Sequence, residues 1–132
     1  MGETDLDRLL RGMSATLREG VFVFATRPDK DIPDGLQPLM TFQEAEGTTL
    51  ILRQEEAEQF GIAHVFPSRM ITLEVHSSLE AVGFIARIAT ALAAQGMGVN
   101  PVSGFFHDHL FVPLGREQEA LDILDALSKG SG

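Results

Sequence analysis

The stretch that decides the fold is Met70-Ile71-Thr72-Leu73-Glu74-Val75-His76, in which apolar and polar side chains alternate. Alternation with a period of two is typical of a strand that buries one face. Apolar residues then recur at helical spacing, at Phe84, Ile88 and Leu92. Glycines in Gly96-Met97-Gly98 end that pattern, as they commonly end helices. The sequence therefore predicts a strand followed by a helix.

Two further apolar runs follow, at residues 99–106 and 110–112, and the polar tripeptide His107-Asp108-His109 separates them. This pattern predicts a hairpin, and an amphipathic helix is expected at residues 116–127. Strand, helix, strand, strand and helix in this order are typical of a ferredoxin-like unit.

The N-terminal part predicts one helix and one interior strand. Thr4 can cap the helix, and its apolar stripe comprises Leu6, Leu9, Leu10, Met13 and Leu17. The run Val21-Phe22-Val23-Phe24-Ala25 is continuously apolar, which favours a strand buried on both faces. Residues 27–38 hold three prolines and an Asp-Gly pair and are expected to form a loop.

The middle of the chain predicts strands at residues 39–44 and 48–53, a short helix at 54–60 and a strand at 62–66. This order resembles that of the later hairpin and its acidic helix, which suggests two related halves. Pro67-Ser68 is the expected boundary, giving an N-terminal domain at 1–67 and a C-terminal domain at 68–132.

Composition excludes several functions. The chain has 132 residues, of which 44% are hydrophobic, and it contains no apolar run long enough to cross a membrane. It has no cysteine, and its first 20 residues lack a signal-peptide pattern, so a cytoplasmic location is expected. A net charge of −9 disfavours binding to nucleic acid. No nucleophile elbow, phosphate-binding loop or zinc-peptidase motif is present, which argues against an enzyme and against a cofactor.

Residues 83–99, GFIARIATALAAQGMGV, resemble the first helix and second strand of an ACT domain, a small regulatory module of amino-acid metabolism. The hairpin at 103–112, SGFFHDHLFV, resembles that of tandem ACT proteins that include cytosolic arginine sensors of animals. Length and arrangement are also similar to uncharacterised bacterial proteins with paired ACT-like domains. The resemblance covers residues 68–127 well and residues 20–66 loosely.

The resemblance implies an α+β protein of two ferredoxin-like subdomains derived from the βαββαβ unit, with antiparallel sheets and helices packed on one face. It implies a non-catalytic regulatory or sensor module that binds a small molecule, most simply an amino acid, and that forms a homodimer. The regulated partner is not identified by the sequence.

Two features depart from the ACT pattern. Members of the family usually carry an aspartate and a proline-glycine pair between the first strand and first helix, whereas this chain has His76-Ser77-Ser78-Leu79-Glu80-Ala81-Val82-Gly83. In addition, no fourth strand can follow the last helix, because residues 128–132 are a polar tail. We expect another segment to close that sheet edge, either residues 21–26 or an edge strand of the first half.

Sheet geometry places the candidate ligand site. In a ferredoxin-like sheet the end of the first strand lies beside the start of the third, so His76 is expected near residues 107–109. The first helix starts at this end, where Ser78 can cap it and free backbone N–H groups near Leu79 can receive a carboxylate. Asp108 can hold an ammonium or guanidinium group. The predicted ligand-binding residues are His76, Ser77, Ser78, Leu79, Gly83, Ser103, Gly104 and Asp108.

Simpler interpretations of these residues stay open. Ser78 is more commonly a helix cap, Gly104 can mark a bulge or close packing, and Asp108 fits a turn position as well as a ligand contact. The histidines His76, His107 and His109 form a candidate metal site or a proton-sensitive switch, although the sequence fixes no further ligand. The same residues with Asp108 could also serve an enzyme. The main alternative function is a protein–protein interaction module that pairs through its sheet edges without a metabolite.

Overall fold

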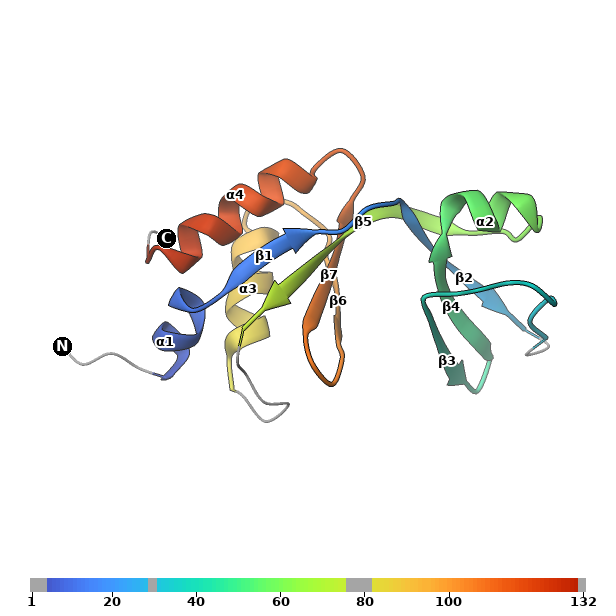
Figure 1. Cartoon of the computed structure of the whole chain (residues 1–132), viewed down its shortest axis with the longest axis horizontal. Coiled ribbons are helices and arrows are strands. Elements are labelled where there is room, and N and C mark those ends of the chain that lie inside the picture. The colour runs from blue at the N-terminus through green and yellow to red at the C-terminus, as the bar shows by residue number, and fades with distance from the viewer. Residues whose placement is uncertain (1–4, 29–30, 76–81, 131–132) are drawn as a thin grey trace.

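A seven-stranded antiparallel sheet runs through the molecule in the computed structural model, which describes residues 5–28, 31–75 and 82–130 (Figure 1). Its strands are β1 (Ser14–Leu17), β2 (Phe22–Arg27), β3 (Met40–Glu44), β4 (Gly47–Arg53), β5 (Val65–Glu74), β6 (Asn100–Ser103) and β7 (Asp108–Pro113). The helices are α1 (Asp5–Arg11), α2 (Gln54–Gln59), α3 (Phe84–Ala93) and α4 (Glu117–Ser128). The sheet order is β3-β4-β2-β5-β7-β6, and β1 also pairs with β5.

Strand β5 belongs to both halves of this sheet. Near its start, Ser68 pairs with Phe22 of β2, and near its end residues 71–74 pair with β1. Along its other edge, residues 68–73 pair with β7. Figure 1 shows β5 passing from the half that holds α2 to the half that holds α3 and α4.

Each half has the strand order of a ferredoxin-like sheet. In the N-terminal half, β2, β3, β4 and the start of β5 supply the four strands, and α2 follows β4. Residues 31–39, the described part of the connection that precedes β3, contain no helix. In the C-terminal half the corresponding strands are β5, β6, β7 and β1, with both helices present as α3 and α4. The two halves therefore differ mainly in their first helix.

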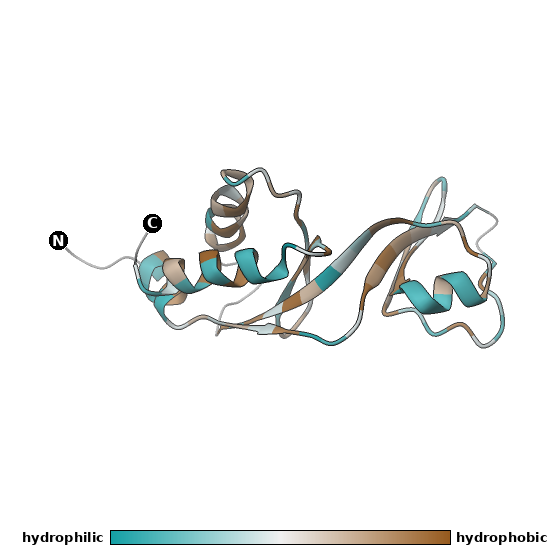
Figure 2. Ribbon diagram, turned by 90° about the horizontal axis from the view of Figure 1, so that it is seen from above, coloured by the Kyte–Doolittle hydropathy of each residue, from teal (hydrophilic) through white to brown (hydrophobic). Residues whose placement is uncertain are grey.

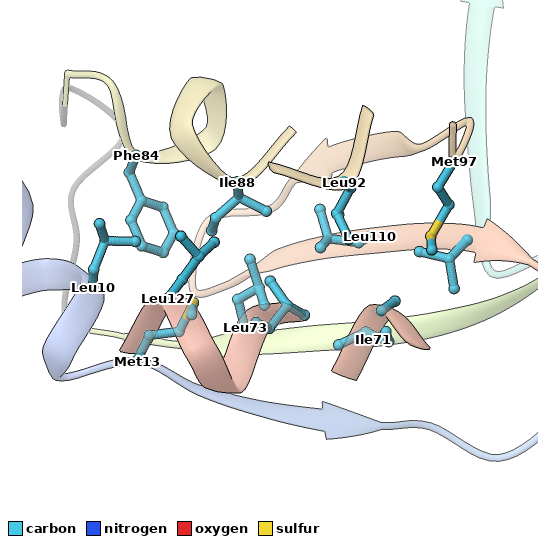
Figure 3. Close-up of a cluster of buried hydrophobic side chains, with 13 residues drawn as sticks. Leu10, Met13, Ile71, Leu73, Phe84, Ile88, Leu92, Met97, Leu110 and Leu127 are labelled. Atoms are coloured by element: carbon cyan, nitrogen blue, oxygen red, sulfur yellow. The ribbon is translucent and has the colours of Figure 1, made fainter. Parts of the chain in front are cut away.

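The larger core lies beneath α3 and α4. Ile88 and Leu92 of α3 are fully buried against Ile71, Leu73 and Leu110 of the sheet (Figure 3). The N-terminal helix α1 adds Leu10 to this core. A smaller cluster around Val23, Leu50 and Leu52 lies beneath α2, and Phe22, Ile51 and Phe111 cluster separately. In Figure 2 the ribbon of α2 is mostly hydrophilic, with Ala57 as its buried residue.

The expected N-terminal helix through Leu17 was wrong beyond Arg11. Residues Ser14–Leu17 instead form β1, with Ala15 opposite Leu73 and Leu17 opposite Ile71. These pairings fill the edge that lacks a strand after α4, so backbone hydrogen bonding to β5 overrides the helical spacing of the side chains. The expectation that residues 21–26 close this edge was wrong for the same reason, because β2 pairs with the other end of β5.

The two strands expected at residues 62–66 and 70–76 are one continuous strand, β5. The expected boundary at Pro67-Ser68 falls within it, and the division of the chain into domains at 1–67 and 68–132 stays a prediction. Phe66 has a positive φ of 58°, and the pairing register with β2 shifts between Phe22 and Phe24. This irregularity lets the chain pass a proline without ending the strand.

The other predicted elements are confirmed with small changes at their ends, including the interior position of β2 between β4 and β5. No helix within the described ranges combines the length and apolarity that crossing a bilayer requires.

The position of α1 predicts that the C-terminal core depends on the N-terminal segment. Leu10 is 3% exposed, so Leu10→Ala should lower the free energy of unfolding by about 2–5 kcal/mol through lost burial and the cavity left behind. Arg8→Ala on the same helix is the control and should change it by less than about 1 kcal/mol, because Arg8 is exposed and its contact with Asp5 is 3.9 Å long. Equal effects of both variants in urea denaturation would contradict this packing.

Candidate functional site

The predicted site lies at the end of the C-terminal half where β5 ends and β7 begins. Asp108 is directly opposite Leu73 of β5 and opposite Ser103 of β6. Cross-strand partners project from the same face of a sheet, and Leu73 is buried beneath the helices. The Asp108 carboxylate therefore projects from the helix-covered face, where it accepts a hydrogen bond from Ser103 Oγ at 2.5 Å.

The first turn of α3 begins at this same end of the half (Figure 1). Gly83 is its N-cap, with a φ of 86° that favours glycine, and it has no side chain to accept from the helix amides. The first backbone bond inside the helix runs from Arg87 N to the Gly83 carbonyl. The amides of residues 84–86 precede that bond and make this helix end suited to an anion.

Half of the predicted ligand residues fall within the described structure. Ser103, Gly104 and Asp108 lie together in the β6–β7 hairpin, and Gly83 caps α3. Gly104 has little room for a side chain, because a Cβ there would lie 3.2 Å from the His107 carbonyl oxygen. His76, Ser77, Ser78 and Leu79 lie outside the described residues.

The opposite face of the same strands carries a polar cluster that sequence reasoning missed. The Thr72 hydroxyl accepts a hydrogen bond from Arg18 Nε and lies 3.0 Å from His109 Nδ1. Glu74 accepts from the Thr16 hydroxyl and lies 3.6 Å from the Arg18 guanidinium. The alternation in residues 70–76 already put Thr72 and Glu74 on one face. The contribution of Thr16 and Arg18 could not be predicted, because the sequence pattern predicted a helix through Leu17 instead of the strand β1.

The contacts of Thr72 and the burial of the ring act together on His109. The Thr72 hydroxyl accepts from Arg18 and keeps a proton that it can donate to His109 Nδ1 when the neutral ring is protonated on Nε2. Burial lowers the pKa of His109, the positive charges of His107 and Arg18 lower it further, and Asp108 acts in the opposite direction. We conclude that this polar cluster stabilises the neutral imidazole.

A metal site finds no support in the part of the chain that the structure describes. The rings of His107 and His109 are 6.4 Å apart between centroids. No group of three histidine, aspartate or glutamate side chains within residues 5–28, 31–75 and 82–130 could hold a metal ion. The third histidine of the sequence hypothesis, His76, lies outside those ranges.

Two family models match the chain. A model described as an ACT domain covers residues 1–69, and a second ACT domain model covers residues 65–126. The chain belongs to the ACT domain family. The two ACT matches overlap at residues 65–69, which are the start of the shared strand β5. The tandem resemblance and the ferredoxin-like fold predicted from sequence are thereby confirmed. ACT domains are regulatory, ligand-binding modules without catalytic activity.

Solved structures share this tandem ACT fold. A Vibrio cholerae protein of unknown function, described as a possible transport protein, is 40% identical, with a TM-score of 0.84 over 93% of this chain and 95% of that chain. An Agrobacterium tumefaciens protein is 17% identical, with a TM-score of 0.69 over 88% and 89%. The ligand-free regulatory subunit of aspartate kinase from Thermus thermophilus is 12% identical, with a TM-score of 0.61 over 86% and 95%. No curated protein matches the chain in sequence.

The lowered pKa of His109 predicts a pH-dependent stability. The unfolded chain binds this proton more readily than the folded chain, so the free energy of unfolding should fall as pH drops below about 6.5. His109→Asn keeps an acceptor near the Nδ1 position and removes the titration. Urea denaturation between pH 7.5 and 5.5 should show a smaller decline for this variant than for the native protein.

His64→Asn in the N-terminal half is the control and should keep the native decline. An unchanged decline in His109→Asn would mean that His109 does not govern stability in this range.

Proposed function

We propose that this protein is a regulatory sensor that binds a free amino acid at the end of its C-terminal half. The observation that carries the proposal is the position of the Asp108 carboxylate on the helix-covered face, at the same end as the start of α3, where Gly83 has no side chain to cap the helix. The helix amides suit a carboxylate and Asp108 suits an ammonium group. An α-amino acid has both groups.

Membership of the ACT family supports this proposal, because ACT domains are regulatory ligand-binding modules. The aspartate kinase regulatory subunit shares the fold, although its low identity carries no ligand to this chain. We assign the binding residues as Gly83, Ser103, Gly104 and Asp108, with His76, Ser77, Ser78 and Leu79 from the adjoining segment.

Binding would act by a shift of populations. A ligand that contacts α3 and the β6–β7 hairpin favours the conformations in which these elements are close. The size of the shift is set by the difference between the ligand's affinities for these conformations and for the more open ones. Both elements pack on β5 or its neighbour β7, and β5 continues into the N-terminal half. In this proposal the protein works in the cytoplasm as a homodimer and passes the signal to a separate partner protein.

A second function, an interaction module that needs no metabolite, is favoured by β3, which forms one edge of the sheet in the described part of the chain. This strand ends the sheet order, and its Phe42 side chain is 62% exposed. An unpaired edge with an exposed aromatic side chain suits strand pairing with another chain. Asp108→Ala separates the two functions, because it should weaken an amino-acid sensor and leave edge pairing intact.

The sensor proposal predicts stabilisation by one or a few related amino acids. At a free concentration one hundred times the dissociation constant, the free energy of unfolding should rise by about 2.7 kcal/mol, which a domain of this size shows as several degrees in Tm. Asp108→Asn should raise the dissociation constant about tenfold or more, because it removes a charge-assisted contact. Thermal denaturation with each of the twenty amino acids provides the measurement.

Asp122→Asn is the matched control, since it makes the same change on the exposed face of α4. It should keep the full ligand response. If no amino acid raises Tm at millimolar concentration, the sensor proposal fails and the interaction module becomes the better explanation.

A further inference from the structure

A hollow of about 450 Å³ lies in the N-terminal half, at the end of the sheet where β2 begins. It is bordered by the start of β2, the end of β4, the first turn of α2 and the segment that leads into β3. Its lining includes Phe22, Gln37, Arg53, Glu55 and Glu56. Three of these five side chains are ionisable, and both signs of charge are present.

At the equivalent place in the C-terminal half the end of α3 precedes β6, and the Arg116 guanidinium donates to the carbonyls of Gln95 and Gly96. Met97, the next residue, is 3% exposed. In the N-terminal half residues 31–39 form no helix, so no helix end fills the corresponding space. The two halves therefore differ at this place, and the hollow lies beside the segment where the described residues form no helix.

Arg53 is held at the hollow without a carboxylate partner. Its guanidinium carbon lies 5.3 Å from the centroid of the Phe22 ring, and it packs so closely on Gly20 that no Cβ would fit there. Among the residues that the structure describes, no acidic side chain forms an ion pair with Arg53. A guanidinium fixed by stacking in this way retains its donors for an anion.

Acidic groups lie on the other side of the hollow, in the first turn of α2. The Glu56 carboxylate accepts a hydrogen bond from Gln37 N at 2.7 Å, which joins α2 to the segment before β3. Glu55 forms no contact with a basic group of the described residues, and it lines the same space. Glu56 therefore supports the wall through Oε2, and its Oε1 remains for a ligand together with the Glu55 carboxylate.

We propose that this hollow is a second ligand site, which binds a small amino acid that carries an additional amine. The ligand carboxylate pairs with Arg53, and its ammonium groups pair with Glu55 and Glu56. The three ionised groups of the lining sum to −1, which favours a ligand of net charge +1 over a neutral or acidic one. This site shares no residue with the Asp108 site and does not depend on it.

L-Ornithine is the probe, and two relatives isolate its groups. Putrescine lacks the carboxylate, and L-norvaline lacks the side-chain amine. Titration of the ¹⁵N-labelled full chain should show saturable ornithine-dependent changes at the amides of Leu36, Gln37, Leu39 and residues 53–56. Putrescine and norvaline should each bind about tenfold more weakly or worse, because each loses one charge-assisted contact.

Arg53→Gln should weaken ornithine binding about tenfold or more, and Arg53→Lys should weaken it less, since lysine keeps the charge without the planar fork. Arg87→Gln on the exposed face of α3 is the charge-matched control and should bind as the native protein does. Asp108→Asn should leave these amide changes intact, which separates this site from the proposed sensor site.

Three results would overturn the proposal. The first is that millimolar ornithine causes no saturable change in the amide signals. The second is that the native protein and the folded Arg53→Lys and Arg53→Gln variants bind ornithine with equal affinity, and the third is that the amide changes are confined to residues 83–86 and 103–108. The last result would leave the sensor site in place and remove only the second site.

Discussion

The hydrogen bonding of β5 on both of its edges is the constraint on which the rest of the structure depends. Ten residues of one strand serve as the last strand of one ferredoxin-like half and the first strand of the next. The edge next to residues 71–74 would stay open after α4, and the chain closes it with β1 from its N-terminus. The C-terminal half is therefore complete only when β1, from the N-terminal part of the sequence, is in place.

This sharing connects the two halves through one strand. In our proposal, a ligand that alters the contacts of α3 and β7 would act on a strand whose first residues lie in the other half. We propose two ligand sites, one where α3 begins and one beside residues 31–39, which form no helix. Regulation by coupling between two sites requires such a connecting element.

Much of this fold could be predicted from sequence because the decisive segments have strong periodicity. Residues 70–76 alternate, and the buried residues Phe84, Ile88 and Leu92 follow helical spacing, so β5, α3 and their order were predictable. The strand β1 was not, because Met13 and Leu17 also fit a helical stripe and only the distant edge of β5 decides between the two conformations. Local propensity does not contain that long-range pairing.

In the candidate site, too, the local contacts could be predicted from the sequence and the long-range contacts could not. Asp108, Ser103 and Gly104 could be placed together because a hairpin is local, and their contacts follow from its register. The link between Arg18 and Thr72 spans more than fifty residues and depends on the unpredicted strand. The hollow beside Arg53 was also beyond sequence reasoning, since it is formed by residues of β2, β4, α2 and the segment before β3 that only the folded sheet brings together.

Native-state hydrogen exchange of the β5 amides tests the shared-strand account most directly. We expect the hydrogen-bonded amides at both ends of β5 to exchange with similar free energies of opening, and an amino acid that binds at Asp108 to raise protection at both ends. Protection that is much lower at residues 65–68 than at 71–74, with a ligand effect confined to the C-terminal half, would contradict it.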